Sequence, residues 1–528
     1  MNKFQRTLIT GATTATLLLN TVLPAFAATT IQITGNGSDS ENEAEIEVEK
    51  ETTVLQTNNA YVVNDIDAES NTGDNEANKN TGSDVTVKTG DAKTKVNVEN
   101  DLNHNTADVD RCGGCDFGEV EVKIADNGAY SENEAELEVE TKTLVTQDNH
   151  AYVKNDIEAE AETGDNEAEK NTGGSVTIET GDAKTKVSAT TAANSNAATV
   201  GGDGPSGKVS ATISGNGYDS ENEVELELEK ETWIQQANSA YVKNDIEAES
   251  ETGDNEAEKN TGGDVTIKTG DAKTSAKVMN TLNANSAWVK GGNGDDGGWI
   301  EAIIRDNGAD SENEIELELE AETTLWQNNN AFVKNDIDAE AETGENEAEK
   351  NTGGEAMIET GDAKTRVHID NMMNFNVADV ECDCLFDNIL AKIAGNGYDS
   401  ENEIEAELED ELFVSQDNCG DLKLGGLYAF DWEYGYGYHR CATINDVDAE
   451  SETGDNEVEK NTDGHDGDPS VETGDAYTKV EADTSGNVNV YGDPGFEWPM
   501  PTPNGTSVNF NFSFDLNDLL AWLLGQQA

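Results

Sequence analysis

Polar and apolar residues alternate with a period of two along much of the chain. From Glu221 to Glu229 every odd position is Glu, and every even position is Asn, Val or Leu. Glu and Leu favour helices by intrinsic propensity, but strict alternation would scatter the Leu side chains around a helix. In a strand it places all the Glu side chains on one face and the apolar ones on the other. The pattern therefore predicts a β-strand.

The alternation continues further along the same unit with smaller residues on the inward face. From Gln236 to Ala248 the residues on that face are Gln, Asn, Ala, Val, Asn, Ile and Ala. Thr-Gly pairs follow at Gly253, Gly262 and Gly270, and glycine at such positions is typical of turns. We expect short strands between these turns and an inner face of small aliphatic residues, Asn, Gln and Thr, almost without aromatic residues.

These features belong to an internal repeat. The string TGDNEAEKNTG and its close variants place their first glycine at Gly73, Gly164, Gly253, Gly344 and Gly454. The intervals are 91, 89, 91 and 110 residues. A second string, TGDAKT or TGDAYT, places its glycine at Gly90, Gly181, Gly270, Gly361 and Gly474. We divide the chain into a signal peptide (1–27), five repeats (28–120, 121–208, 209–300, 301–390 and 391–490), a Pro/Gly-rich linker (491–505) and a C-terminal tail (506–528).

Two all-β architectures suit repeats of this size. One is a row of separate β-sandwich beads, which need large hydrophobic residues on both inner faces. The other is a β-solenoid-like stack of the five repeats, in which equivalent positions form ladders. Stacked Asn and Gln side chains stabilise each other through amide hydrogen bonds. We favour the solenoid, because the units have no recurring buried Trp or Cys pair.

The charge of the chain narrows the classes of partner. Among 528 residues there are 110 acidic side chains and 32 Lys plus Arg, a formal net charge of −78, and 34% of residues are hydrophobic. Low hydrophobicity with high net charge is typical of disorder, but the acidic residues are regularly spaced and Pro occurs only 7 times. The charge argues against nucleic acid as a partner, because phosphate contacts need clustered Lys and Arg.

Stacked repeats would bring Glu rows of like charge together, which is destabilising. Rows of Lys compensate in part, and either salt or a divalent cation must screen the remainder. Calcium is a hard cation that prefers carboxylate oxygens. We expect calcium ligands at the two turn motifs and in a DGHDGD stretch. The candidate metal ligands are Asp74, Asp254, Asp91, Asp271, Asp463, Asp466 and Asp468.

The N-terminus and the cysteines point to an extracellular location. Residues 1–27 have basic residues, an apolar stretch and an Ala-Phe-Ala end, which is the pattern of a secretory signal peptide. No later stretch has the length that a membrane span requires. Six cysteines in an oxidising compartment favour disulfides. Cys419 and Cys441 bracket an insertion (419–441) in the fifth repeat, and we expect a disulfide between them to close it. Cys112, Cys115, Cys382 and Cys384 lie in two equivalent edge loops, where they pair locally or between molecules.

Two segments do not repeat. The insertion has an aromatic residue at every second position, namely Tyr428, Phe430, Trp432, Tyr434, Tyr436 and Tyr438. On a strand these side chains share one face, which either binds a surface glycan or packs as a cap on the solenoid. The C-terminal tail alternates apolar residues and either adds a strand to a neighbouring molecule, giving self-association, or caps its own solenoid.

The pattern V-x-Q-x-N-x-A-x-V-x-N, followed by T-G-x-N-x-A-x-x-N-T-G and T-G-x-A, resembles a family of uncharacterised secreted bacterial repeat proteins. The resemblance covers all five repeats and implies an extracellular bacterial location without a known activity. The Q-x-N-x-A spacing is also similar to the repeats of curli-type amyloid subunits, which implies only a similar solenoid fold.

From the sequence we expect a secreted, acidic, self-associating structural protein that depends on cations. The alternative is an adhesin that binds glycans through the aromatic insertion, and a remote one is a polysaccharide-active solenoid enzyme. We do not expect an enzyme, because the acidic residues have copies in the other repeats and no GxSxG, HExxH or phosphate-loop motif occurs.

Overall fold

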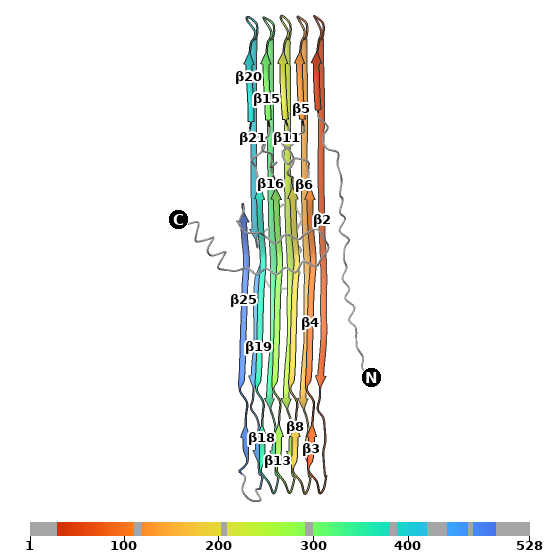
Figure 1. Ribbon diagram of the computed structural model, residues 1–528, viewed down its shortest axis with the longest axis vertical. Coiled ribbons are helices and arrows are strands. Elements are labelled where there is room, and N and C mark those ends of the chain that lie inside the picture. Colours follow the sequence, from red (N-terminus) through yellow and green to blue (C-terminus); the bar gives the residue numbers. More distant parts are fainter. Residues whose placement is uncertain are drawn as a thin grey trace, which may run out of the picture.

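The computed structural model describes residues 29–109, 119–201, 208–290, 299–380, 388–419, 441–462 and 468–492. Every regular element in these ranges is a β-strand, and the strands form five stacked coils, one for each repeat (Figure 1). The predicted all-β, solenoid-like stack is therefore confirmed. Within the same ranges, no helix has the length and apolar character needed to cross a membrane.

Each coil contains the same strands in the same order. The first coil contains β1 (Thr29–Thr34), β2 (Glu41–Asn71), β3 (Val85–Lys88) and β4 (Ala92–Val109). The second contains β5 (Glu119–Ala125), β6 (Glu132–Gly164), β7 (Glu167–Glu169), β8 (Val176–Glu179) and β9 (Ala183–Val200). The third contains β10 (Lys208–Ser214), β11 (Glu221–Gly253), β12 (Glu256–Glu258), β13 (Val265–Lys268) and β14 (Ala272–Val289). The fourth contains β15 (Trp299–Arg305), β16 (Glu312–Gly344), β17 (Glu347–Glu349), β18 (Ala356–Glu359) and β19 (Ala363–Val380). The fifth contains β20 (Asn388–Ala394), β21 (Glu401–Asn418), β22 (Ala442–Glu452), β23 (Glu457–Glu459), β24 (Ser470–Glu472) and β25 (Ala476–Tyr491).

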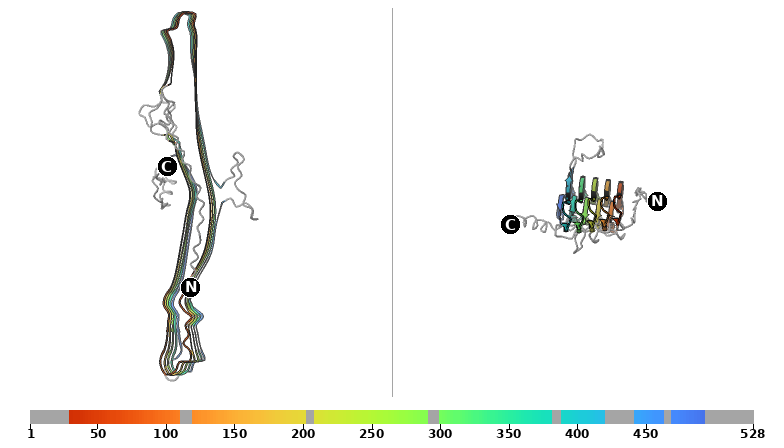
Figure 2. Two further views of the ribbon diagram at one scale, coloured as in Figure 1. Left: turned by 90° about the vertical axis from the view of Figure 1, so that its right-hand side faces the viewer. Right: turned by 90° about the horizontal axis from the view of Figure 1, so that it is seen from above.

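The strands of successive coils pair in parallel, and each residue lies opposite its own copy. Glu221 of β11, for example, pairs with Glu132 of β6 on one side and Glu312 of β16 on the other. The largest sheet has the order β2-β6-β11-β16-β21, and β22 also pairs with β16. Each coil is a long flat loop whose two layers run side by side over much of its length (Figure 2). The pairing shows that one coil spans one whole repeat.

The core is a thin layer between these two faces. In β11 the inward residues are buried and the Glu residues between them are half-buried or exposed, which gives the predicted alternation. At one end of the coil, Leu226 and Leu228 pack against the short sheet that contains Ile213. Nearer the first turn, Ile246 packs against Val278 of β14. Aliphatic residues thus fill both ends of the long strand.

In the middle of the core, side-chain amide ladders are interspersed with buried aliphatic residues such as Ile234 and Val242. The Asn238 amide nitrogen donates to the side-chain oxygens of Asn285, at 2.8 Å, and Asn329, at 3.0 Å. The Asn238 oxygen accepts a hydrogen bond of 3.0 Å from Asn149 in the preceding coil. Gln236 forms a second ladder, because it donates to Gln147 and accepts from Gln327, each at 2.8 Å. Buried polar groups of this kind are tolerated only when they are hydrogen-bonded.

The two layers are displaced by about half a coil along the stack. Strand β4 contacts both β2 of its own coil and β6 of the next, and β9 likewise contacts both β6 and β11. In the last coil, β25 contacts only β21 and β22 of its own coil among the long strands facing it. The displacement therefore leaves β25 projecting beyond β21 and β22, the other long strands of the last coil.

We predict that Asn238→Ala lowers the stability of the fold strongly. The substitution removes one hydrogen bond from each of the buried amides of Asn149, Asn285 and Asn329, at a cost of about 0.5–1.5 kcal/mol for each bond. Urea unfolding followed by circular dichroism measures the change. Asn97→Ala, at an exposed position of β4, is the matched control and should leave the midpoint unchanged; equal effects of the two substitutions would contradict the ladder's role.

Candidate metal centre

The first turn follows the long strand of each coil and places carboxylates of successive coils in a row. Asp254 comes directly after β11 and has a left-handed backbone, with φ of 52°. Its counterparts share this conformation and are Asp74, Asp165, Glu345 and Asp455. The preceding Gly253 has no room for a side chain, because a Cβ there would lie 2.1 Å from the carbonyl oxygen of Gly344. Close contact between coils thus requires glycine here and brings the carboxylates together.

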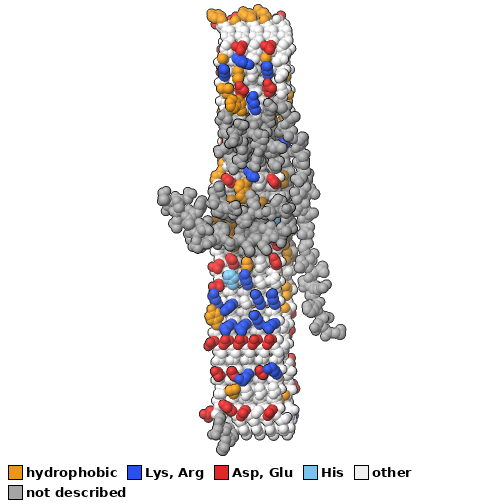
Figure 3. Space-filling view, viewed as in Figure 1, with side chains coloured by type: hydrophobic (Ala, Val, Ile, Leu, Met, Phe, Trp, Pro, Cys, Tyr) orange, Lys and Arg blue, Asp and Glu red, His pale blue; other side chains and the backbone are white. Residues whose placement is uncertain are grey.

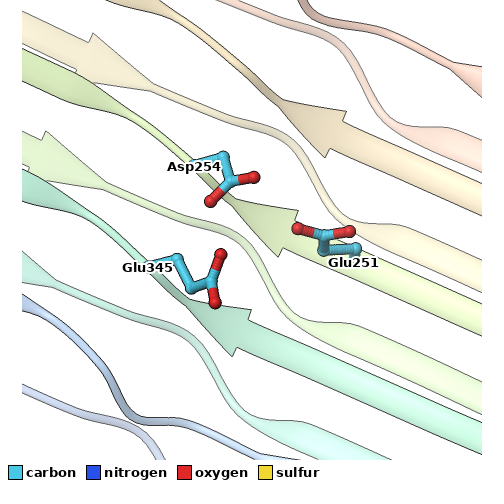
Figure 4. Close-up of side chains that lie close together, drawn as sticks. All are labelled: Glu251, Asp254 and Glu345. Atoms are coloured by element: carbon cyan, nitrogen blue, oxygen red, sulfur yellow. The ribbon is translucent and has the colours of Figure 1, made fainter.

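Three carboxylates converge at this turn in the middle of the stack. Carboxylate oxygens of Glu251, Asp254 and Glu345 all lie within 4.8 Å of one another. Figure 4 shows Glu251 at the end of β11, Asp254 on the turn beyond it and Glu345 on the same turn of the next coil. Glu251 is half-buried, and the other two residues are exposed. The group is therefore open to solvent on one side.

Burial, together with the neighbouring carboxylates, raises the pKa values of Glu251 and Asp254. Burial, with the charges of Asp254 and Glu342 added, raises the pKa of Glu251 to about 8. Burial and a hydrogen bond with Glu345 raise the pKa of Asp254 to about 6. At the copies of Glu251 in the neighbouring coils, burial is again the main cause, and the pKa of both Glu162 and Glu342 rises to about 7. Near neutral pH the row thus retains protons.

A bound cation would replace these protons. Calcium takes six to eight oxygen ligands, with carboxylates among the preferred ones, and the turn offers three carboxylates from two coils. The donor set therefore fits a hard divalent cation, with water supplying the remaining ligands. The turn recurs in each coil, but among the described residues three carboxylates converge only here, and the first coil has Asn71 in place of the glutamate.

The second turn, which the sequence also suggested for calcium, has a different arrangement. The Asp271 carboxylate accepts a hydrogen bond of 3.0 Å from the backbone N–H of Asp362 and one of 2.6 Å from Lys273. Asp91 is held in the same way by the backbone of Asp182 and by Lys93. The hydrogen bond from Lys273 lowers the pKa of Asp271. These aspartates link neighbouring coils as anions, so the first turn is the stronger candidate.

Lysines compensate a second row of acids. Lys350 lies 2.9 Å from Glu258 of the preceding coil, and Lys460 lies 2.7 Å from Glu349. Hydrogen bonds from Lys350 and Lys460 lower the pKa of Glu349 to about 2. Figure 3 shows rows of acidic and basic side chains that cross the coils. The predicted compensating row of Lys is therefore present. The first turn differs from it, because Glu251, Asp254 and Glu345 lie close to other carboxylates rather than to Lys.

The other predicted site residues are placed as follows. Asp254 belongs to the cluster, whereas Asp74 lies on the equivalent turn of the first coil, where Asn71 replaces the glutamate and donates to Glu162. Asp468 is exposed. The residues that lie outside the described ranges are Asp463, Asp466, Cys112, Cys115, Cys382, Cys384, Tyr428, Phe430, Trp432, Tyr434, Tyr436 and Tyr438. Calcium binding, intermolecular cysteine pairing and glycan binding by these residues remain predictions.

Two features were not identified from the sequence. Glu251 and Glu345 were not among the candidate ligands, although a glutamate three positions before the turn residue recurs in four of the repeats and was a usable signal. An outer row of stacked aromatic rings also links the coils, with Tyr241 centred 5.0 Å from Tyr152 and 5.1 Å from Phe332. The disulfide between Cys419 and Cys441, by contrast, is present as the sequence predicted, at the start and end of the insertion in the fifth coil.

In comparisons with known proteins, no family model, no curated protein sequence and no solved structure matches this chain. Its function must therefore be inferred from its own residues.

We predict that, in EGTA, the folded chain is less stable at about pH 8.5 than at about pH 5.5. The raised pKa of Glu251, about 8 against an ordinary 4.5, means that the folded state binds more protons than the unfolded state between these limits. The free energy of unfolding therefore falls as pH rises through this window. Thermal unfolding across the pH range measures it.

The substitution Glu251→Gln should reduce this dependence on pH and raise the midpoint at the alkaline end. Glu247→Gln, at an exposed position of the same strand, is the matched control. A midpoint that rises with pH in the parent chain would disprove the assignment. Acidification below about pH 4.5 should reverse the trend, because the lowered pKa of Glu349 then makes protonation destabilising.

Proposed function

We propose that the protein is an extracellular structural protein, a stiff acidic β-solenoid whose coils are held together by divalent cations. The observation that supports this most directly is the carboxylate turn in the middle of the stack, where Glu251 and Asp254 of one coil lie close to Glu345 of the next. A cation bound there would link two neighbouring coils.

The charge supports a cation-dependent role. The chain has 32 basic against 110 acidic side chains, and in-register pairing places Glu on Glu along the long strands. Desolvation and the neighbouring Glu138 and Glu318 raise the pKa of Glu227, so this crowding has an electrostatic cost. Cations that bind between coils offset such repulsion, and extracellular calcium modules bind with dissociation constants of about 0.1–1 mM.

The disulfide between Cys419 and Cys441 supports the location, because disulfides persist mainly in oxidising compartments outside the cytosol. The N-terminal segment has the composition of a secretory signal. Both features agree with a protein that works at the cell surface or in the surrounding medium.

The proposal predicts that calcium raises the midpoint of thermal unfolding and that the rise continues with the logarithm of its concentration. Scanning calorimetry in calcium and in EGTA with NaCl, at equal ionic strength, separates specific binding from screening. The double substitution Glu251→Gln and Glu342→Gln should remove most of the rise. Its control, Glu247→Gln with Asp338→Asn at exposed positions of the same strands, should retain it.

Location is tested independently. Antibody labelling of intact cells and fractionation of the culture should detect the chain outside the cytoplasm. A calorimetric midpoint equal in calcium and in NaCl would contradict cation dependence, and a chain confined to the cytoplasm would contradict the extracellular role.

A further inference from the structure

We infer that the two ends of the solenoid bind each other, so that the last coil of one molecule stacks on the first coil of a second copy. This inference rests on the proposed structural function and names its partner. It comes from three features of the end coils: their shape, their charges and their glycines.

The ends have complementary shapes. The inward valines of β4 are buried because β4 is covered by strands of two coils, and Val96 is 6% exposed. The equivalent strand of the last coil, β25, lacks the second cover, and Val480 is 45% exposed. At the opposite end, the inward residues Ile66 and Ala68 of β2, which face the layer that contains β4, are only partly buried. The projecting β25 of one molecule thus fits the uncovered side of β2 in another, as β4 fits against β6.

The ends also have complementary charges. Within the molecule, Lys350 and Lys460 each contact the glutamate of the preceding coil. The same spacing across the junction would place Lys79 of the second copy beside Glu459. A second row alternates in sign over the first four coils, where Lys88 pairs with Glu179 at 2.9 Å, and it ends with Glu472 beside Glu359. Stacking would give Glu472 a basic neighbour, because it would place Lys88 of the second copy beside it.

At a third set of equivalent positions, the side chain is charged in the inner coils and aliphatic in the first and last coils. The inner coils have Lys154, Lys243 and Lys334 at this position, whereas the first coil has Val63 and the last has Ile444. Val63 is 43% exposed and Ile444 is 42% exposed. In a stacked pair these two side chains would be neighbours and would cover each other.

Both end coils have glycines at positions where no close contact within the molecule requires glycine. A Cβ on Gly344 would lie 2.2 Å from the carbonyl oxygen of Gly454, so contact with the next coil requires glycine there. A Cβ on Gly454 itself would meet only open space, with one side-chain atom at 4.0 Å. At the first coil, Gly37 and Gly90 likewise have nothing within 4 Å. A stacked second copy supplies the close contact at all three positions.

The contact is heterologous, because the two surfaces differ, and it does not close on itself. Such contacts generate open filaments. The chain beyond residue 492 and the insertion between Cys419 and Cys441 both leave from the last coil and are the competing occupants of its open edge. The experiment below includes them as outcomes.

The test uses two variants of the full chain, each blocked at one end. The first-coil variant carries Gly37→Ala and Gly90→Ala, and the last-coil variant carries Gly454→Ala and Glu472→Lys. None of the introduced Cβ atoms at the glycines meets a close neighbour within the molecule, so both variants should unfold at the midpoint of the parent chain. Gly253→Ala is the matched control inside the stack and should lower the midpoint, because its Cβ would lie 2.1 Å from a carbonyl oxygen.

Analytical ultracentrifugation under non-reducing and reducing conditions, in calcium, then measures the assembly. We expect a concentration-dependent series of oligomers for the parent chain and only monomers for each variant alone. An equimolar mixture of the two variants should give dimers and nothing larger, because each retains one open end. Electron microscopy of the parent chain should show filaments whose width equals that of one molecule.

Two outcomes would overturn the inference. A parent chain that stays monomeric at every concentration would mean that its own C-terminal segment or insertion covers the last coil. A mixture that stays monomeric while the parent chain associates would place the contact elsewhere. Either result leaves the calorimetric response to calcium and the extracellular location untouched, so the proposed function is judged separately.

Discussion

In-register parallel stacking is the constraint on which the rest of the structure depends. Neighbouring strands lie about 4.8 Å apart, so every side chain meets its own copy above and below. A side chain is therefore accepted in the stack only if it packs well against itself. Asn and Gln meet this condition because a primary amide both donates and accepts, as Asn149, Asn238 and Asn329 do in sequence. Aliphatic and aromatic side chains also meet it, whereas carboxylates do not.

This constraint explains how a chain with 34% hydrophobic residues forms an ordered fold. The thin space between the two layers leaves no room for a wide apolar core. Aliphatic residues fill its ends, and amide ladders interspersed with aliphatic residues fill its middle. Each ladder satisfies buried polar groups that would otherwise cost about 1–3 kcal/mol each. The polar interior is stable only as long as the register is kept, which makes the coils depend on one another.

The sequence predicted the parts of this structure that follow from period and repetition. The alternation of residues from Gln236 to Ala248 identified the side chains that face inward, and the repeats indicated that equivalent strands stack. Alternation contains no information on where a chain turns back, so the length of a coil follows only from the pairing of Glu221 with Glu132 and Glu312.

The candidate site was predicted in part for a similar reason. Asp254 stands in a recognisable turn motif. Glu251 lies close to it at the half-buried end of the preceding strand, and Glu345 lies close to it because it occupies the same turn of the next coil. Asp271 stands in an equally suggestive motif, yet Lys273 and the backbone of Asp362 already bind it. A motif identifies acidic residues at a turn, whereas only the stacked structure distinguishes those that lack a basic partner.

Because the coils stack by translation, every coil added to the stack repeats both the attraction and the repulsion between neighbouring coils. Hydrogen bonds and amide ladders contribute one increment of cohesion for each coil, and the Glu rows and the carboxylate turn contribute one increment of repulsion. The sign of their sum is the same for a coil within the molecule and for a coil of a second molecule. Conditions that stabilise the fold should therefore also favour the proposed contact between the ends, so that folding and the proposed assembly would respond together to the ionic environment.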